Sequence, residues 1–127
     1  MTLHAYKSVQ RATLREGASP HQLIEMLYDG ALNNIAIARR CISNADRRML
    51  HHQTDKAVAI VQELQASLKD YDTNELSANL FELYTYIVST LVTAERSMDD
   101  EAFGICAHLI DILRDAWVSI APETAAA

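Results

Sequence analysis

The feature that most constrains the fold is a helix start near residue 19, followed by a long apolar stripe. Ser19 can cap the helix, because its hydroxyl can accept a hydrogen bond from a backbone N–H that otherwise lacks a partner. Pro20 suits the first helical position, and Gln22 stands three residues after Ser19, as a capping box requires. A helix is therefore predicted from Pro20 to about Ala45. Its apolar residues recur at helical spacing: Ile24, Leu27, Tyr28, Ala31, Ile35, Ala38 and Ile42.

The Asp29-Gly30 pair within this stretch competes with a continuous helix, because Asp-Gly often forms a turn. The apolar periodicity continues past the pair without a break, so we expect the helix to continue as well. A glycine inside a helix costs about 1 kcal/mol relative to Ala. Gly30 is therefore expected to allow a neighbouring element to pack closely.

A second helix is predicted from the cap residue Asp46 to about Lys69. Its first part, residues 47–55, is mostly polar, which favours partial unwinding of that segment. The apolar stripe that indicates its core-facing side consists of Leu50, Ala57, Ile60 or Val61, Leu64 and Leu68.

Two more helices follow a short polar turn. Asp72 and Glu75 have the spacing of a capping pair, and the helix after them is expected from about Asn74 to Ser97. Asp99 caps the last helix, which Pro122 ends. The core-facing stripes of these two helices are Leu76, Leu80, Leu83, Tyr84, Ile87, Leu91 and Ala94, and then Phe103, Cys106, Ile110, Leu113, Trp117 and Ile120.

Four long helices joined by short polar turns indicate an all-α fold, an antiparallel up-down four-helix bundle. Three Gly and two Pro among 127 residues, half of them apolar, agree with a helical chain. A single domain is expected over residues 1–127, with the bundle at residues 19–121 and a flexible tail at 122–127. Residues 1–18 are expected to form a short N-terminal helical cap segment, lined by Leu3, Tyr6, Val9 and Leu14.

The charge balance argues against nucleic acid or an anionic membrane as the main partner, because the net charge is −6 and the pI is near 5.2. No apolar run approaches the ~20 residues that a membrane span needs, and no apolar signal region is found at the N-terminus. Cys41 and Cys106 lack the spacing of a zinc finger or a redox motif. We therefore expect reduced, buried cysteines in a cytoplasmic protein that is a monomer or a weak homodimer.

The last two predicted helices carry more apolar residues than one core-facing stripe requires. These residues either form the edges of a wide core or line a groove for a partner helix. The pattern leaves both interpretations open. The second stripes lie about 100° from the first and consist of Phe81, Val88 and Val92 in one helix, and Ala102, Ile105, Leu109, Ile112 and Ala116 in the other.

No catalytic, metal-binding or cofactor-binding pattern stands out, so we expect no enzyme activity, no metal and no cofactor. None of the five histidines has an acid three residues before it, as a di-iron bundle needs. No Gly-rich phosphate loop and no nucleophile with an evident base is found. The enzymatic alternative is a histidine phosphotransfer domain, in which His52 precedes Lys56 by one turn or His108 serves instead.

A basic cluster surrounds the first predicted turn, with Arg39 and Arg40 before it and Arg47 and Arg48 after it. Such a cluster is either a solvated face that complements a helix C-terminus or a docking surface for an acidic partner. The sequence does not distinguish these interpretations.

The segment from Ala18 to Leu32, reading A-S-P-H-Q-L-I-E-M-L-Y-D-G-A-L, closely resembles the signature of the flagellin-specific export chaperones, the FliS family. Further matches to that family follow in the same order along the chain, so that the resemblance spans Ala5 to Trp117. They are Ala5-Tyr6, Lys56-Ala57, Ile60 to Leu64, Ser67-Leu68, Asn79-Leu80, Leu83-Tyr84 with Tyr86, and Leu113 to Trp117.

The resemblance implies a cytosolic four-helix bundle with a small N-terminal cap. It also implies a function: binding the C-terminal segment of newly made flagellin, preventing premature polymerisation, and presenting the complex to the gate of the flagellar type III export apparatus. The alternative is a paralogue of the same fold that serves another flagellar or secreted client. The residues expected to bind flagellin or the export gate are Leu3, Tyr6, Phe81, Tyr86, Val88, Val92, Ile105, Leu109 and Ile112.

Overall fold

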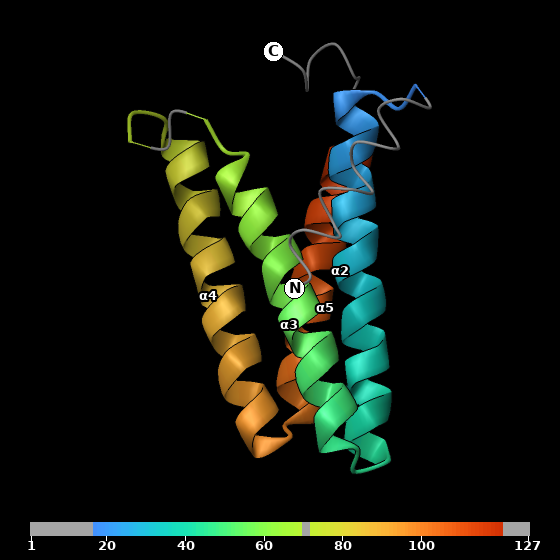
Figure 1. Ribbon diagram of the computed structural model, residues 1–127. Coiled ribbons are helices and arrows are strands. Elements are labelled where there is room, and N and C mark those ends of the chain that lie inside the picture. The colour runs from blue at the N-terminus through green and yellow to red at the C-terminus, as the bar shows by residue number, and fades with distance from the viewer. Residues whose placement is uncertain (1–16, 70–71, 121–127) are drawn as a thin grey trace.

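The computed structural model describes residues 17–69 and 72–120. Four helices run alternately up and down, side by side (Figure 1): α2 (Pro20–Ser43), α3 (Arg47–Ala66), α4 (Glu75–Ser97) and α5 (Asp100–Val118). The prediction of an all-α antiparallel bundle is thus confirmed. The predicted cap segment, residues 1–18, and the predicted tail, residues 122–127, lie almost entirely outside the described residues. None of the described helices is long and apolar enough to cross a membrane.

The start of α2 is closed by the predicted capping box. The Ser19 hydroxyl oxygen accepts a hydrogen bond from the backbone N–H of Gln22 at 3.1 Å. In return, the Gln22 side-chain oxygen accepts one from the Ser19 N–H at 2.8 Å. Two backbone donors that the helix itself cannot pair are therefore satisfied.

Replacing Ser19 with Ala should lower the free energy of unfolding by about 1 kcal/mol, because the Gln22 N–H loses its acceptor. Urea unfolding of both proteins measures this difference. Ser19→Asp is the control, since an Asp at this position can accept the same bond and should stay close to the wild type. An unchanged midpoint for Ser19→Ala would mean that the box contributes nothing in solution.

Gly30 lies inside α2, as the periodicity predicted, and it faces α3. A Cβ atom built on Gly30 would lie 3.2 Å from the Cδ1 atom of Ile60, which is closer than nearly all ordinary contacts. The glycine therefore lets α2 and α3 approach closely, which offsets the intrinsic cost of Gly in a helix.

Two details of the predicted helix starts are wrong. Residues 47–55 are regular helix and not partly unwound, because Leu50, Gln53 and Thr54 are buried at helical spacing and fix the segment to the bundle. The cap of α4 is Asn74 and not Asp72: the Asn74 side-chain oxygen accepts from the Ser77 N–H at 3.1 Å. Both residue types are good caps, so the sequence offered two starts two residues apart.

The caps of α3 and α5 are as predicted, and three predicted helix ends are slightly too late, since α3 ends at Ala66 and not near Lys69. Asp46 accepts from the Met49 N–H and Asp99 from the Ala102 N–H, each at 3.1 Å. α2 ends at Ser43, and α5 ends at Val118, ahead of the proline at position 122.

The helices form a square in which α2 and α4 each pack against α3 and α5. The two diagonal helices meet through one buried polar contact, because the hydroxyl oxygens of Tyr28 in α2 and Tyr84 in α4 lie 2.7 Å apart. Burial raises the pKa of both phenols, so both stay protonated and one donates to the other.

Burial in α4 and α5 is uneven along their length. The buried residues of α4 are found from Tyr84 onward, and those of α5 only as far as Ile110. Leu76, predicted as core, is 68% exposed, and the predicted core residue Ile120 is also exposed. The apolar period shows which side of a helix faces inward, but not how far neighbouring helices cover it. The predicted core residues that are only partly buried are Ile24, Ile42, Leu68, Leu80, Leu83, Leu113 and Trp117.

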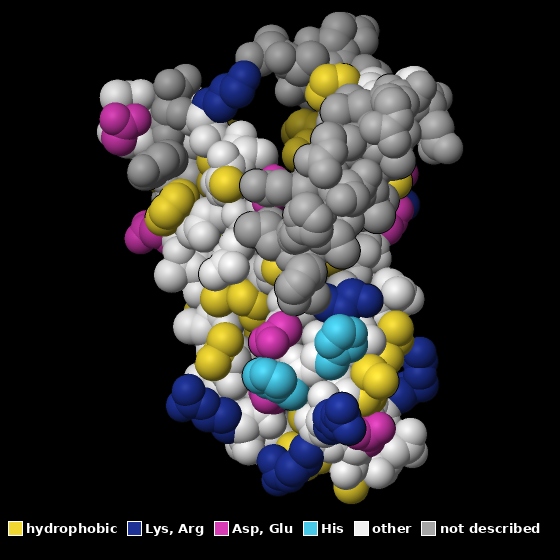
Figure 2. All heavy atoms as spheres, in the orientation of Figure 1, with side chains coloured by type: hydrophobic (Ala, Val, Ile, Leu, Met, Phe, Trp, Pro, Cys, Tyr) yellow, Lys and Arg dark blue, Asp and Glu magenta, His cyan; other side chains and the backbone are white. Residues whose placement is uncertain are grey.

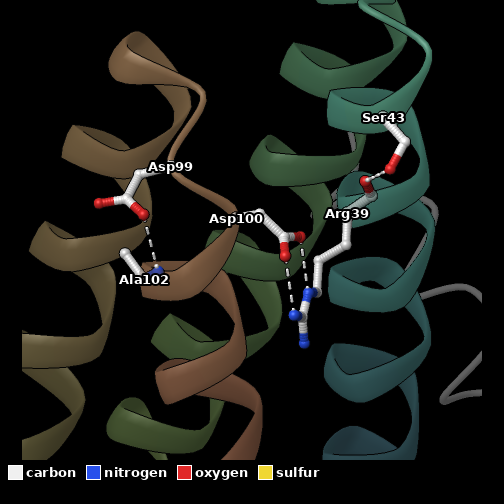
Figure 3. A network of polar contacts seen from close by, with 5 residues as sticks. All are labelled: Arg39, Ser43, Asp99, Asp100 and Ala102. Carbon is white, nitrogen blue, oxygen red and sulfur yellow. Dashed lines mark hydrogen bonds and ion pairs between the residues drawn. The ribbon is translucent and has the colours of Figure 1, made fainter.

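An ion pair ties α2 to α5 at the end of the bundle where α5 begins (Figure 3). The Arg39 guanidinium donates two hydrogen bonds to the Asp100 carboxylate, from Nε at 2.8 Å and from Nη2 at 2.9 Å. This contact lowers the pKa of Asp100. Gly104 leaves room for the guanidinium, because a Cβ atom there would lie 2.9 Å from Arg39 Nη1.

Candidate functional site

The described residues include one cluster of side chains with metal-ligating atoms: His51, Asp55 and Glu95. His51 Nδ1 lies 2.8 Å from a Glu95 oxygen, and Nε2 lies 3.3 Å from an Asp55 oxygen. Each ring nitrogen thus has its own carboxylate, an arrangement that suits a protonated imidazole bridging α3 and α4. The hydrogen bond to Glu95, together with the charges of Glu95 and Asp55, raises the pKa of His51.

We expect replacement of Glu95 by Gln to lower the pKa of His51 toward its ordinary value near 6.5, because the larger of the two stabilising charges is removed. Since folding raises this pKa, the contribution of His51 to stability is present below about pH 6.5. It is lost as the pH rises through the folded-state pKa. NMR titration of the imidazole resonances measures the shift, and Asp55→Asn should give a smaller one. A His51 pKa that does not respond to Glu95→Gln would contradict the contact.

The second apolar stripe of α5 faces the α4 side and is largely exposed. Asp100 and Arg114 lie on the opposite side of α5, where they reach Arg39 and Asp29 of α2. Ile105 is 47% exposed and Ile112 is 52% exposed, with the partly buried Leu109 between them. These three residues therefore line the outside of the boundary between α4 and α5.

Tyr86 joins this surface from α4. It is 51% exposed. Its side of α4 is the one away from α3, because Gln65 and His51 of α3 reach α4 at Phe81 and Glu95, on the other side. We name Tyr86, Ile105, Leu109 and Ile112 the α4–α5 face. Three of these four apolar residues are exposed, which makes this face the candidate docking surface.

The other predicted stripe of α4 lies on its α3 side and is mostly covered. Phe81 and Val88 are partly buried, and Val88 packs against the core. The Gln65 side chain donates to the Phe81 carbonyl at 3.0 Å and to the Thr85 hydroxyl at 2.8 Å. Only Val92 in this stripe is substantially exposed, at 38%. Val88 is thus an edge residue of the core, whereas Val92 is exposed. The three residues share one side of α4, and this side is not that of the α4–α5 face.

Figure 2 views the bundle from the α3 side and shows hydrophobic side chains over α4 and α3, interrupted by polar groups. The candidate site, the α4–α5 face, lies on the side of α4 away from α3. The two remaining predicted site residues, Leu3 and Tyr6, lie outside the described residues.

Sequence reasoning missed a polar contact between the start of α2 and the end of α5. The rings of His21 and Trp117 stack, with centroids 4.8 Å apart and planes inclined by 15°. The Trp117 Nε1–H donates to the His21 carbonyl at 2.9 Å. These residues are almost a hundred positions apart, and only the spacing of Trp117 in the α5 stripe hinted that it faces inward.

The cysteines are both buried and free, as predicted. Burial raises the pKa of the Cys106 thiol to about 11 and also raises the pKa of Cys41. Both thiols therefore stay protonated near neutral pH, which makes them poor nucleophiles.

Comparison with known proteins identifies relatives that span nearly the whole chain. A family model described as "Flagellar protein FliS" matches residues 2–124. The flagellar secretion chaperone FliS of Salmonella typhimurium is 34% identical over 122 residues, which cover 95% of this chain and 90% of that protein. The FliS of Bacillus subtilis is 34% identical over 100 residues, covering 79% and 74%. The FliS of Escherichia coli is 30% identical over 114 residues, covering 89% and 84%.

Proposed function

The chain belongs to the FliS family of flagellar proteins, and from this premise we propose that it is a flagellar secretion chaperone whose client is flagellin. In this proposal it binds the C-terminal region of flagellin, prevents premature polymerisation and presents the client to the flagellar export apparatus. It acts in the cytoplasm, as a monomer or weak homodimer, by binding and not by catalysis. The observation that carries the proposal is the exposed α4–α5 face, on a chain whose relatives are named secretion chaperones.

The α4–α5 face suits an amphipathic client helix. Tyr86, Ile105, Leu109 and Ile112 offer apolar contact along two adjacent helices, and an amphipathic helix binds such a surface through residues one turn apart. An exposed Leu76 on α4 supplies a further apolar contact beyond this face. A client helix in this position would extend the bundle by one element.

Reversible binding follows from the same physics. A client segment that folds as it binds buries a large surface, but ordering the segment costs about 2–5 kcal/mol or more of the interaction energy. The complex is then specific without being so tight that export is blocked. We propose that residues 1–18 take part, through Leu3 and Tyr6, by docking on the bundle and being displaced or read by a partner.

Calorimetric titration of the full chain with the C-terminal segment of its own organism's flagellin tests the proposal. We expect saturable, stoichiometric binding, a negative heat-capacity change from apolar burial, and slower flagellin polymerisation measured by light scattering. The N-terminal segment of the same flagellin is the matched control. Binding of neither segment would reject flagellin as the client and leave another flagellar or secreted client as the alternative.

A further inference from the structure

Four exposed arginines near one end of the bundle form no ion pair with any residue that the structure describes: Arg40, Arg47, Arg48 and Arg96. Arg40 is in the last turn of α2 and Arg96 in the last turn of α4, while Arg47 and Arg48 open α3. The alternating helix directions bring these helix ends together (Figure 1). Figure 2 shows Lys and Arg side chains gathered over this lower part of the molecule. We name these four residues the basic end.

Helix stability accounts for only half of the basic end. A cation in the last turn of a helix interacts favourably with the helix dipole, which explains Arg40 and Arg96. Arg47 and Arg48 occupy the first turn of α3, where a cation is unfavourable, and no acidic residue lies in that turn. By contrast, Arg39 and Arg114 are held by carboxylates of neighbouring helices. The fold therefore gives no reason for two adjacent arginines at this position.

We propose that the basic end binds an acidic segment of a partner polypeptide. Guanidinium groups recognise carboxylates through paired hydrogen bonds, and several of them without internal partners are available here. Met49 follows the arginine pair and is exposed, so it adds an apolar contact beside the charges. The chain as a whole carries a net charge of −6, so that a local positive surface attracts acidic groups while the rest of the molecule repels nucleic acid.

The arginine pair of the basic end, Arg47 and Arg48, differs in place from the α4–α5 face, although Arg96 belongs to α4. Arg47 and Arg48 lie at the α2–α3 turn, across the square of helices from the boundary between α4 and α5. A client on the α4–α5 face therefore leaves the α2–α3 turn accessible, and the acidic partner is a second protein bound at the same time. This inference goes beyond the proposed function, and its test does not depend on flagellin.

Fluorescence anisotropy with two labelled peptides tests the inference on the full chain. One peptide repeats Glu-Glu-Leu-Gly, and the other repeats Gln-Gln-Leu-Gly. We expect the acidic peptide to bind at low ionic strength, with an affinity that falls as salt is raised, and the neutral peptide not to bind. The Arg47→Glu and Arg48→Glu double variant should bind the acidic peptide about tenfold more weakly. The variant should fold at least as well as wild type, because acidic residues are favourable in a first turn.

Lys69→Glu, paired with the single variant Arg47→Glu, is the matched control, because it makes the same charge change at an exposed residue after the far end of α3. Arg47→Glu should lower the affinity for the acidic peptide about threefold, and Lys69→Glu should leave that affinity unchanged. If Arg47→Glu and Lys69→Glu lost the same affinity for the acidic peptide, the loss would come from net charge alone, and the proposal would be overturned. So would no binding by wild type, or stronger binding of an RNA oligonucleotide than of the acidic peptide.

Discussion

The Ile112→Asp variant is expected to bind the flagellin C-terminal segment about thirtyfold more weakly than wild type, a loss of about 2 kcal/mol. Ile112 is 52% exposed in the free bundle, so water solvates the new carboxylate and the fold loses little stability. A docked client helix would exclude that water and leave an unpaired charge against apolar side chains. Calorimetric titration measures the affinity, and a urea melt of the same variant measures the stability.

Two further variants make this result specific. Val118→Asp adds the same charge at an exposed apolar residue of α5, one turn after Arg114 and on the α2 side, and binding should be unchanged. Val88→Asp places the charge on a residue that packs against the core, so it should lower the free energy of unfolding by about 2 kcal/mol or more. Full flagellin affinity in a folded Ile112→Asp protein would exclude the α4–α5 face as the client site.

The helix starts were the most predictable part of the fold, because capping is local. Ser19, Asp46 and Asp99 each bond a backbone N–H three residues ahead, so the sequence alone contains both partners. The cap of α4 was misplaced by two residues because Asp72 and Asn74 are both suitable caps.

Contacts between distant residues were out of reach of such reasoning. The Tyr28–Tyr84 hydrogen bond joins residues 56 positions apart and depends on the relative height of two diagonal helices. The contact between Trp117 and His21 depends on how far α5 extends along α2. Periodicity gives the direction in which a side chain points, but it does not give the register of one helix against another.

The candidate site was predicted in part for the same reason. The surplus of apolar residues on α4 and α5 was evident from the sequence, as was the choice between a wide core and a groove. The structure gives a different answer for each stripe: Val88 packs against the core, whereas Ile105 and Ile112 are about half exposed. Which stripe is covered depends on where the neighbouring helix lies, and a single helix sequence does not encode that.

Replacing Leu91 with Ala is expected to lower the free energy of unfolding by about 2–5 kcal/mol, whereas Leu76→Ala should cost at most about 0.5 kcal/mol. Both leucines lie on the same apolar stripe of α4, and sequence reasoning placed both in the core. Leu91 is fully buried, so the substitution leaves a cavity, whereas Leu76 is 68% exposed and has few contacts to lose. Urea unfolding of the two variants compares the effect of the same substitution, Leu to Ala, at two positions of the same helix.

These variants also show how far along α4 the neighbouring helices cover its apolar side. The buried residues of α4 run from Tyr84 to Ala94, and the turns before Tyr84 contribute only the partly buried Leu80 and Leu83 to the core. Leu80→Ala, at a partly buried position between the two leucines, should fall between them in cost. A graded loss along α4 would mean that cooperative packing begins near Tyr84 and leaves the first turns available to a client. Equal losses at Leu76 and Leu91 would mean that the first turns of α4 close onto the bundle in solution, and the exposed surface would then end at the α4–α5 face.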